Sequence, residues 1–214
     1  MKFIQESCEK FSELLAAKVS TPGGGGAAAL TGALSAALCS MVGNFTLGKK
    51  KYADVEDDIK IILDKAEKLR LRFLELVDED AQAFEPLSQA YAIAKDNPER
   101  DKILEQALLN ACKAPLKMLE QCAEVIKLLE EMSAKGSRLL ISDVGCGASL
   151  CNAAMESAAL NIFVNTSLLK DRNNAAELEA QTDKILNEYS PRASEIVKNV
   201  SEIMRRSHFI IHVR

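Results

Sequence analysis

The feature that most constrains the fold is the spacing of apolar residues, which recur every three or four positions along almost the whole chain. This spacing places apolar side chains on one face of an α-helix. No segment sustains the alternation of apolar and polar residues that predicts a β-strand. The pattern therefore predicts an all-α fold, a single-domain, up-and-down bundle of long helices.

The bundle is expected to comprise residues 1–206, with residues 207–214 as a frayed tail. Asp54 and Asp171 precede helical patterns and have the residue type of N-caps, while Pro86 and Pro191 are expected to kink their helices. The fourth helix is expected to continue past Pro115. Helices are predicted over residues 3–18, 27–47, 54–94 and 97–132, after Asp143 to about residue 164, and over 171–204.

Residues 19–48 contain no charged side chain and are numerous enough to cross a bilayer. Small residues dominate this stretch, which opens with a proline and four glycines. Its small side chains recur every four positions, so that a second helix can approach closely. A buried central helix is therefore expected here, with no membrane span. The repeating small residues are Ala28, Gly32, Ala36 and Ser40.

The net charge of -4 gives no reason to expect nucleic acid as a partner. The six cysteines are scattered and form no Cys-x-x-Cys pair, as is usual for reduced, mostly buried thiols. The first ten residues are polar and show no signal peptide. These features favour a cytoplasmic protein.

A run of four glycines precedes the predicted central helix. Glycines allow the backbone to approach a ligand closely, and a helix start offers free N–H groups with partial positive charge. A carboxylate, a phosphate or a developing oxyanion would suit such a site. The competing interpretation is a flexible connection between helices. The candidate binding residues are Pro22, Gly23, Gly24, Gly25 and Gly26.

Asp80 interrupts the apolar stripe of the third predicted helix, because it lies four residues after Leu76 and four before Phe84. A carboxylate on the inward face loses hydration, which raises its pKa towards the range useful for general acid–base catalysis. Asp78 is expected to face water and points away from Asp80, so the two cannot act as a pair. A capping or salt-bridging role is the alternative for Asp80.

Three further residues are candidates for substrate contact. Asp143 stands near a predicted helix start, where an N-cap is the alternative role. Asn161 and Asn165 are four residues apart on an otherwise apolar helix. Buried amides need hydrogen-bond partners, and these could be ligand atoms or a neighbouring helix.

Lys49 and Lys50 follow the predicted C-terminus of the central helix, where cations are favoured by the helix dipole. They could form an anion-binding rim or simply a solvated helix end. The two histidines, His208 and His212, lie in the predicted tail. No carboxylate or cysteine near them completes a metal site, so no metal is expected.

With these residues in view, the chain resembles the cyclodeaminase domain of the formiminotransferase-cyclodeaminase family. The resemblance extends from residue 1 to about residue 205, and the matching motifs occur in the family's order. They are Thr21-Pro22-Gly23-Gly24-Gly25, Met41-Val42-Gly43-Asn44-Phe45-Thr46, Gly48-Lys49-Lys50-Lys51-Tyr52, Asp80-Ala81-Gln82-Ala83-Phe84, Ser142-Asp143 and Asn161-Ile162-Phe163-Val164-Asn165.

The resemblance implies an all-α homodimer that acts on a tetrahydrofolate derivative without a cofactor or metal, and it places the catalytic aspartate at Asp80. The expected reaction converts 5-formimidoyltetrahydrofolate to 5,10-methenyltetrahydrofolate with release of ammonia, as in histidine degradation. A separate formiminotransferase would then be a partner, because this chain lacks that domain. Two alternatives remain: a methenyltetrahydrofolate cyclohydrolase of the same family, and a non-catalytic helical dimer that binds a small anion.

Overall fold

The fold is all-α, as predicted, and the computed structural model describes residues 2–211, with side chains as far as residue 206. No strand occurs among these residues. The helices are α1 (Cys8–Ala16), α2 (Gly24–Asn44), α3 (Glu56–Tyr91), α4 (Arg100–Ala111), α5 (Lys113–Lys135), α6 (Ile141–Thr166) and α7 (Arg172–Ile211), with short 3-10 turns η1 (Phe3–Gln5), η2 (Lys50–Val55) and η3 (Arg138–Leu140).

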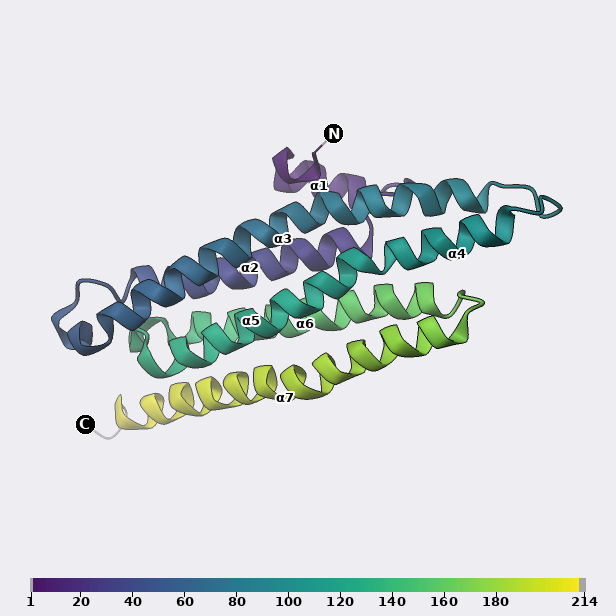
Figure 1. Cartoon of the computed structure of the whole chain (residues 1–214). Coiled ribbons are helices and arrows are strands. Elements are labelled where there is room, and N and C mark those ends of the chain that lie inside the picture. Colours follow the sequence, from purple (N-terminus) through teal and green to yellow (C-terminus); the bar gives the residue numbers. More distant parts are fainter. Residues whose placement is uncertain (1, 212–214) are drawn as a thin grey trace.

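The long helices lie roughly side by side in an elongated bundle (Figure 1). Helices α2 and α6 form one layer, and α3 and α5 lie in front of them, with α7 alongside α5 and α6. Helix α4 extends beyond the start of α5 and packs against the C-terminal half of α3. Helix α2, with 21 residues, is roughly 30 Å long, whereas α3 has 36 residues and α7 has 40, so these two extend well beyond it.

Helix α2 is the central element, and it contacts α3, α5 and α6. Its small residues let these helices come close: a Cβ atom on Gly32 would lie 2.5 Å from the Phe73 ring of α3. The hydroxyl of Ser35 donates to the carbonyl of Gly147 at 2.7 Å, which ties α2 to α6. Helix α2 is long and apolar enough to cross a membrane, and 56% of its most apolar window is buried in the bundle, as in the core helix that the sequence predicts.

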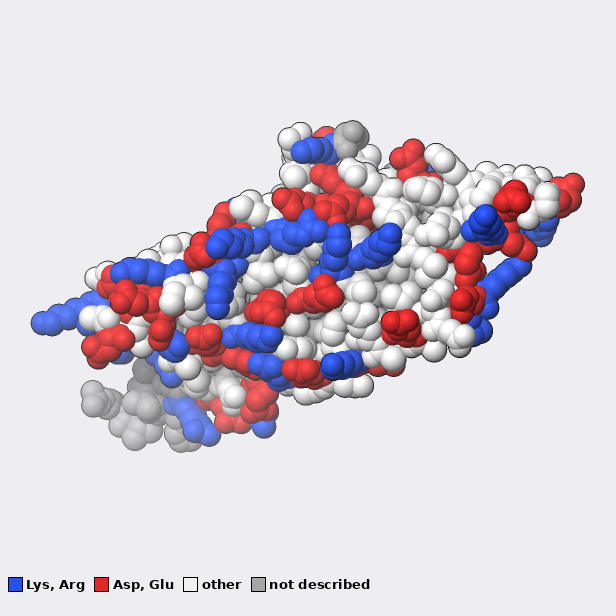
Figure 2. Space-filling model, in the orientation of Figure 1, with Lys and Arg blue, Asp and Glu red and all other residues white. Residues whose placement is uncertain are grey.

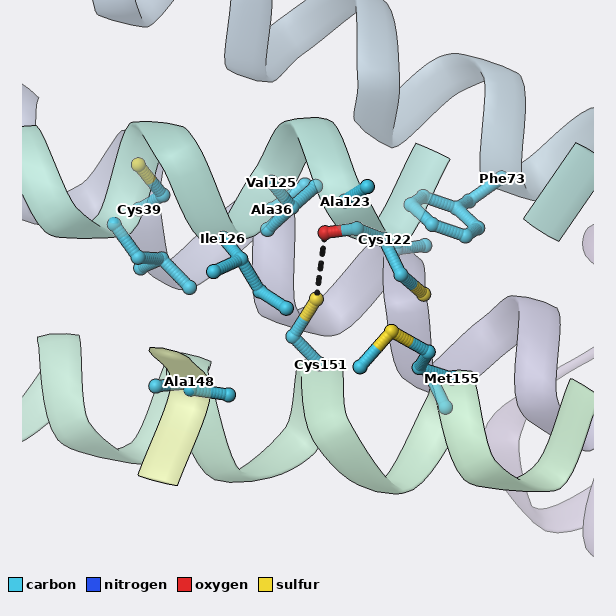
Figure 3. Close-up of a cluster of buried hydrophobic side chains, with 14 of the residues drawn as sticks. Ala36, Cys39, Phe73, Cys122, Ala123, Val125, Ile126, Ala148, Cys151 and Met155 are labelled. Atoms are coloured by element: carbon cyan, nitrogen blue, oxygen red, sulfur yellow. Dashed lines mark hydrogen bonds between the residues drawn. The ribbon is translucent and has the colours of Figure 1, made fainter. Parts of the chain in front are cut away.

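Small and sulfur-containing side chains fill the space between the layers (Figure 3). The thiol of Cys151 on α6 donates to the carbonyl oxygen of Cys122 on α5 at 3.3 Å. Burial raises the pKa of the Cys39 thiol to about 12, so this group stays protonated at neutral pH. The buried cysteines thus act as compact apolar residues of the core.

Two predicted helices are each divided in the structure. The first is broken between η1 and α1, where the hydroxyl of Ser7 caps α1 by accepting from the N–H of Lys10 at 3.0 Å. The fourth is two helices that meet at Cys112. Pro115 then falls in the first turn of α5, where its missing N–H costs no helical hydrogen bond.

Other boundaries also differ from prediction. Asp54 is not an N-cap, because η2 precedes α3 and Val55 occupies that position. Asp171 does cap α7, since it accepts from the N–H groups of Asn173 and Asn174. Helix α7 continues to Ile211 instead of ending near residue 204. The prediction about His208 and His212 lies outside the described side chains.

Candidate functional site

A cavity of about 250 Å³ opens where four segments of the chain meet. Its walls come from the start of α2 with the loop before it, the C-terminal half of α3, the junction of α4 with α5 and the C-terminal half of α6. The lining residues are Ser20, Thr21, Gly23, Gly24, Gly25, Asp80, Phe84, Ala111, Pro115, Asn161, Val164 and Asn165. The glycine run, the stripe-interrupting aspartate and both predicted asparagines are thus brought together.

The glycines form the first turn of α2 itself, three residues earlier than the predicted helix start. Gly23 is the N-cap, in an extended conformation, and Gly24, Gly25 and Gly26 follow as helical residues. The first-turn N–H groups of a helix have no partner within the helix. One of them is used here, because the N–H of Gly26 donates to the Asp80 carboxylate.

Asp80 lies against this first turn so closely that only glycine fits opposite it. A Cβ atom on Gly25 would overlap all three atoms of the Asp80 carboxylate group. Gly25 therefore determines the distance between α2 and the functional group of α3. Any residue with a Cβ atom at position 25 would therefore have to displace either the Asp80 side chain or one of the two helices.

Burial raises the pKa of Asp80 to about 6, against the opposing effect of the hydrogen bond from Gly26. Desolvation dominates because a carboxylate loses more hydration than one backbone N–H restores. A carboxyl group with this pKa exchanges its proton readily near neutral pH. Among the residues that line the cavity, Asp80 is the one with a carboxyl group.

Asp78 does not face water, so that prediction was wrong. Its side chain is only 8% exposed, and Oδ1 accepts a hydrogen bond from the N–H of Phe3 at 2.8 Å. The N-terminal segment covers this face of α3, and the periodicity of α3 alone contains no information about that cover. Asp78 anchors the N-terminus and does not line the cavity.

Asn161 and Asn165 project from successive turns of α6. Each amide donates to the carbonyl one turn earlier: Asn161 to Ser157 and Asn165 to Asn161, both at 2.8 Å. These bonds orient the two side chains beside the glycine turn, with the Asn161 amide next to Gly24. Both residues line the cavity, where amide side chains are polar groups available to a ligand.

Several predicted binding residues lie elsewhere. Lys49 and Lys50 follow the opposite end of α2, roughly 30 Å from the cavity within the same chain. Asp143 is in the first turn of α6, roughly 27 Å along that helix from Asn161. Pro22 and Gly26 are buried just behind the cavity wall, where a Cβ atom on Gly26 would touch Pro22 at 3.4 Å.

Phe84, Ala111, Pro115 and Val164 line the cavity but were not singled out from the sequence. They are apolar residues whose contribution depends on how α4, α5 and α6 pack. Among the described residues, no group of three or more His, Cys, Asp or Glu side chains is arranged to hold a metal ion.

These features define a class of helical protein: a bundle whose cavity contains one partly desolvated carboxyl group at the start of a glycine-rich helix. The model of the formiminotransferase-cyclodeaminase family matches residues 7–184, and the chain belongs to this family.

The relatives include folate enzymes of two kinds. The chain is 40% identical over 199 residues to a methenyltetrahydrofolate cyclohydrolase of Methylorubrum extorquens, covering 91% of this chain and 96% of that protein. It is 27% identical to the formimidoyltransferase-cyclodeaminase of Sus scrofa, covering 87% of this chain and 35% of that longer protein. Its fold is similar to the crystal structure of formiminotetrahydrofolate cyclodeaminase from Thermotoga maritima, with a TM-score of 0.80, 28% identity and coverage of 92% of this chain and 98% of that one.

Proposed function

We propose that this protein is a methenyltetrahydrofolate cyclohydrolase whose general base is Asp80. The observation that carries the proposal is the position of Asp80, a carboxyl group with a pKa of about 6 in a cavity at the start of α2. The cyclohydrolase of Methylorubrum extorquens supports this choice of reaction, because the similarity extends over almost all of both chains. The order of the two activities is thus reversed from the expectation based on sequence alone.

Cyclodeamination of formimidoyltetrahydrofolate is the second candidate, and the similarity to the Thermotoga maritima cyclodeaminase supports it. The two reactions share a tetrahedral carbon bonded to N5 and N10 of the folate. In one the third substituent is the oxygen of water, and in the other it is the nitrogen that leaves as ammonia. One site with one movable proton could serve both reactions.

In the proposed hydrolysis, water attacks the carbon that bridges N5 and N10, and the Asp80 carboxylate accepts the proton that the water loses. The resulting tetrahedral intermediate has a C–OH group. When the bond from carbon to one ring nitrogen breaks, Asp80 returns the proton to that nitrogen, and the hydroxyl group loses its own proton to solvent as it becomes the formyl carbonyl. A single carboxyl group suffices, since it acts first as base and then as acid.

In the proposed deamination, N10 attacks the formimidoyl carbon on N5. Asp80 takes the proton from N10 and delivers it to the nitrogen that leaves as ammonia. Neither route uses a redox step, so no cofactor is required. Both reactions require that the folate is held with its reacting atoms close together. A cavity that fits the substrate can hold it in that geometry.

The charges near the cavity suit this chemistry. A methenyl bridge carries positive charge, which an ionised Asp80 compensates as the substrate binds. The free N–H groups at the start of α2 favour anionic groups of the substrate or a developing oxyanion. Asn161 and Asn165 line the same cavity, and their amides supply polar groups for hydrogen bonds to the pterin ring.

The activity can be tested with two assays on the purified chain. Loss of the methenyltetrahydrofolate absorbance measures hydrolysis, and appearance of the same absorbance from formimidoyltetrahydrofolate, with ammonia, measures deamination. We expect enzymatic hydrolysis well above the spontaneous rate. Ammonia release without accelerated hydrolysis would identify the chain as a cyclodeaminase, and inactivity in both assays would contradict the proposal.

The rate should depend on pH because the ionised form of Asp80 is the base. Its pKa of about 6 predicts that kcat/KM rises as the pH increases through 6 and levels off above it, where the carboxylate is fully formed. The rising limb should disappear in Asp80→Asn. A midpoint near 4, the ordinary value of an exposed aspartate, would show that the catalytic group is not a desolvated carboxyl.

A further inference from the structure

Many polar side chains of this protein are engaged with a partner in the folded chain. On the face that Figure 2 shows, charged residues of both signs are interspersed over the surface. Many of the charged residues form ion pairs, such as that of Arg72 on α3 with Glu75 and Glu79, at 2.7 and 2.6 Å. A polar group without such a partner, in a cavity, is therefore a candidate for a role in function.

The threonine hydroxyl groups show this contrast clearly. The chain contains five threonines, and four of them donate to the backbone carbonyl three or four residues earlier, at 2.7 to 3.2 Å: Thr31, Thr46, Thr166 and Thr182. Such a bond satisfies the hydroxyl group locally. The hydroxyl of Thr21, in contrast, has no hydrogen-bond partner among the described residues.

Thr21 lines the cavity that contains Asp80. It is half-buried and stands between Ser20, which is exposed, and Pro22, which is buried. Its hydroxyl oxygen is accessible, because within the described part of the chain the buried side-chain oxygen without a partner is that of Ser40. Thr21 therefore provides a free hydroxyl group where the cavity meets solvent.

The backbone around Thr21 is held in place. Pro22 restricts the conformation of the residue before it, and it packs behind the cavity wall, where a Cβ atom on Gly26 would touch it at 3.4 Å. The N–H of Gly26 in turn donates to the Asp80 carboxylate. One short segment thus supplies both a backbone donor to Asp80 and the free hydroxyl of Thr21.

The proposed hydrolysis needs a second group that holds the attacking water. Asp80 accepts one proton of this water as the general base. The other hydrogen stays on the oxygen and becomes the hydroxyl hydrogen of the tetrahedral intermediate. The carboxylate alone does not fix the direction of that hydrogen, and so does not fix the orientation of the lone pair that attacks carbon. A threonine hydroxyl can accept this hydrogen.

The other polar side chains of the cavity suit this task less well. Besides Asp80 and Thr21 they are Ser20, Asn161 and Asn165. Ser20 is exposed, so bulk water competes for its hydroxyl group. Each asparagine already uses one amide hydrogen on a backbone carbonyl of α6, and the proposed function assigns both amides to the pterin ring.

We propose that Thr21 positions the attacking water and thereby determines whether the site can hydrolyse its substrate. The inference rests on the proposed function and identifies the residue that distinguishes its two candidate reactions. Thr21 Oγ1 accepts a hydrogen bond from the water while Asp80 takes the other proton. When the intermediate collapses, Oγ1 accepts the proton of the C–OH group and passes its own proton to solvent, so Thr21 is left unchanged.

Deamination has no use for this hydroxyl group. The nucleophile is N10 of the folate itself, and the tetrahedral carbon carries nitrogen where the hydrolytic intermediate carries oxygen. No water has to be positioned, and no C–OH group has to lose a proton. Removal of the Thr21 hydroxyl should therefore affect the two reactions differently.

Thr21→Val removes the hydroxyl group and keeps the shape of the side chain. In hydrolysis of methenyltetrahydrofolate, kcat should fall about 10-fold to 100-fold because the water is no longer oriented, with KM little changed. In deamination of formimidoyltetrahydrofolate, kcat should stay within about twofold of wild type. Thr21→Ser should restore most of the hydrolysis, and the pH midpoint of Thr21→Val should stay near 6, since Asp80 is intact.

Thr182→Val is the matched control. It makes the same chemical change on α7, which contributes no residue to the described cavity, and at a hydroxyl that already has a backbone partner. Its kinetics should match wild type. Equal losses of both reactions in Thr21→Val, or a loss that Thr21→Ser does not restore, would show that Thr21 merely shapes the cavity. Undiminished hydrolysis in Thr21→Val would overturn the inference as well.

Further outcomes separate the inference from the proposed function. Asp80→Asn should lower both rates at least about 100-fold, whatever residue stands at position 21. An active Asp80→Asn variant would contradict the proposed function, whereas an inactive one beside a fully active Thr21→Val would overturn only the role of Thr21. A wild-type chain that deaminates without hydrolysing would also overturn that role. If the chain only hydrolyses, the separate changes in kcat and KM and the rescue by serine decide.

Discussion

Replacing Asp80 by Asn should lower kcat on the order of 100-fold to 10,000-fold, which is the usual contribution of a general acid–base group. The amide has nearly the same volume and can still accept the hydrogen bond from the Gly26 N–H. It cannot move a proton, so the loss should appear in kcat while KM changes far less. Steady-state kinetics on methenyltetrahydrofolate and on formimidoyltetrahydrofolate will measure both constants.

The control for this substitution is Glu85→Gln. Glu85 is an exposed carboxylate on the same helix, outside the cavity, and its variant should retain wild-type activity. Asp78→Asn is unsuitable as a surface control, because Asp78 is buried and binds the N-terminal segment. Equal activity of Asp80→Asn and Glu85→Gln would remove Asp80 from the mechanism.

Asp80→Asn should also leave stability unchanged or increase it. The pKa of Asp80 in the folded state is about 6, above the value of about 3.9 for an unfolded chain. The folded state therefore holds the proton more tightly, and the free energy of unfolding falls as the pH rises between these two values. Above that range the ionised group destabilises the fold by on the order of 1 kcal/mol, after allowance for its partial exposure. Denaturant unfolding near neutral pH should show this gain, and the gain should vanish in acid.

Much of the fold could be predicted because helical periodicity is a local property. The apolar stripe of α3 identified Asp80 as the inward-facing acid, since Leu76 and Phe84 share its face. The same reasoning failed for Asp78, which is covered by a segment 75 residues away in the sequence. A helix can have a second buried face, and its own sequence shows only the larger one clearly.

The candidate site shows the same limit. The glycines, Asp80, Asn161 and Asn165 were each recognisable by residue type, and the structure brings them to one cavity. Phe84, Ala111 and Pro115 gave no signal, because an apolar residue that lines a cavity looks like any residue of the core. Lys49 and Lys50 carried the charge expected of an anion-binding rim, but they follow the end of α2 opposite to the cavity.

Gly25→Ala should reduce activity nearly as much as the loss of Asp80 itself. An added methyl group would occupy the space of the Asp80 carboxylate, so either the carboxylate must turn away or α2 and α3 must separate. A displacement of about 1 Å can cost on the order of 100-fold in rate when a catalytic group must be held in place. Kinetics should therefore show a large fall in kcat, together with a changed pH midpoint as the environment of Asp80 alters.

Gly26→Ala is the matched control for that substitution. It makes the same chemical change one residue later in the same turn and keeps the N–H that binds Asp80. Its Cβ atom meets Pro22 at 3.4 Å, an ordinary contact. A far smaller loss is expected, so equal losses in the two variants would indicate a general disturbance of the helix start. Wild-type kinetics in Gly25→Ala would show that Asp80 need not lie against α2, and the catalytic geometry proposed here would then be wrong.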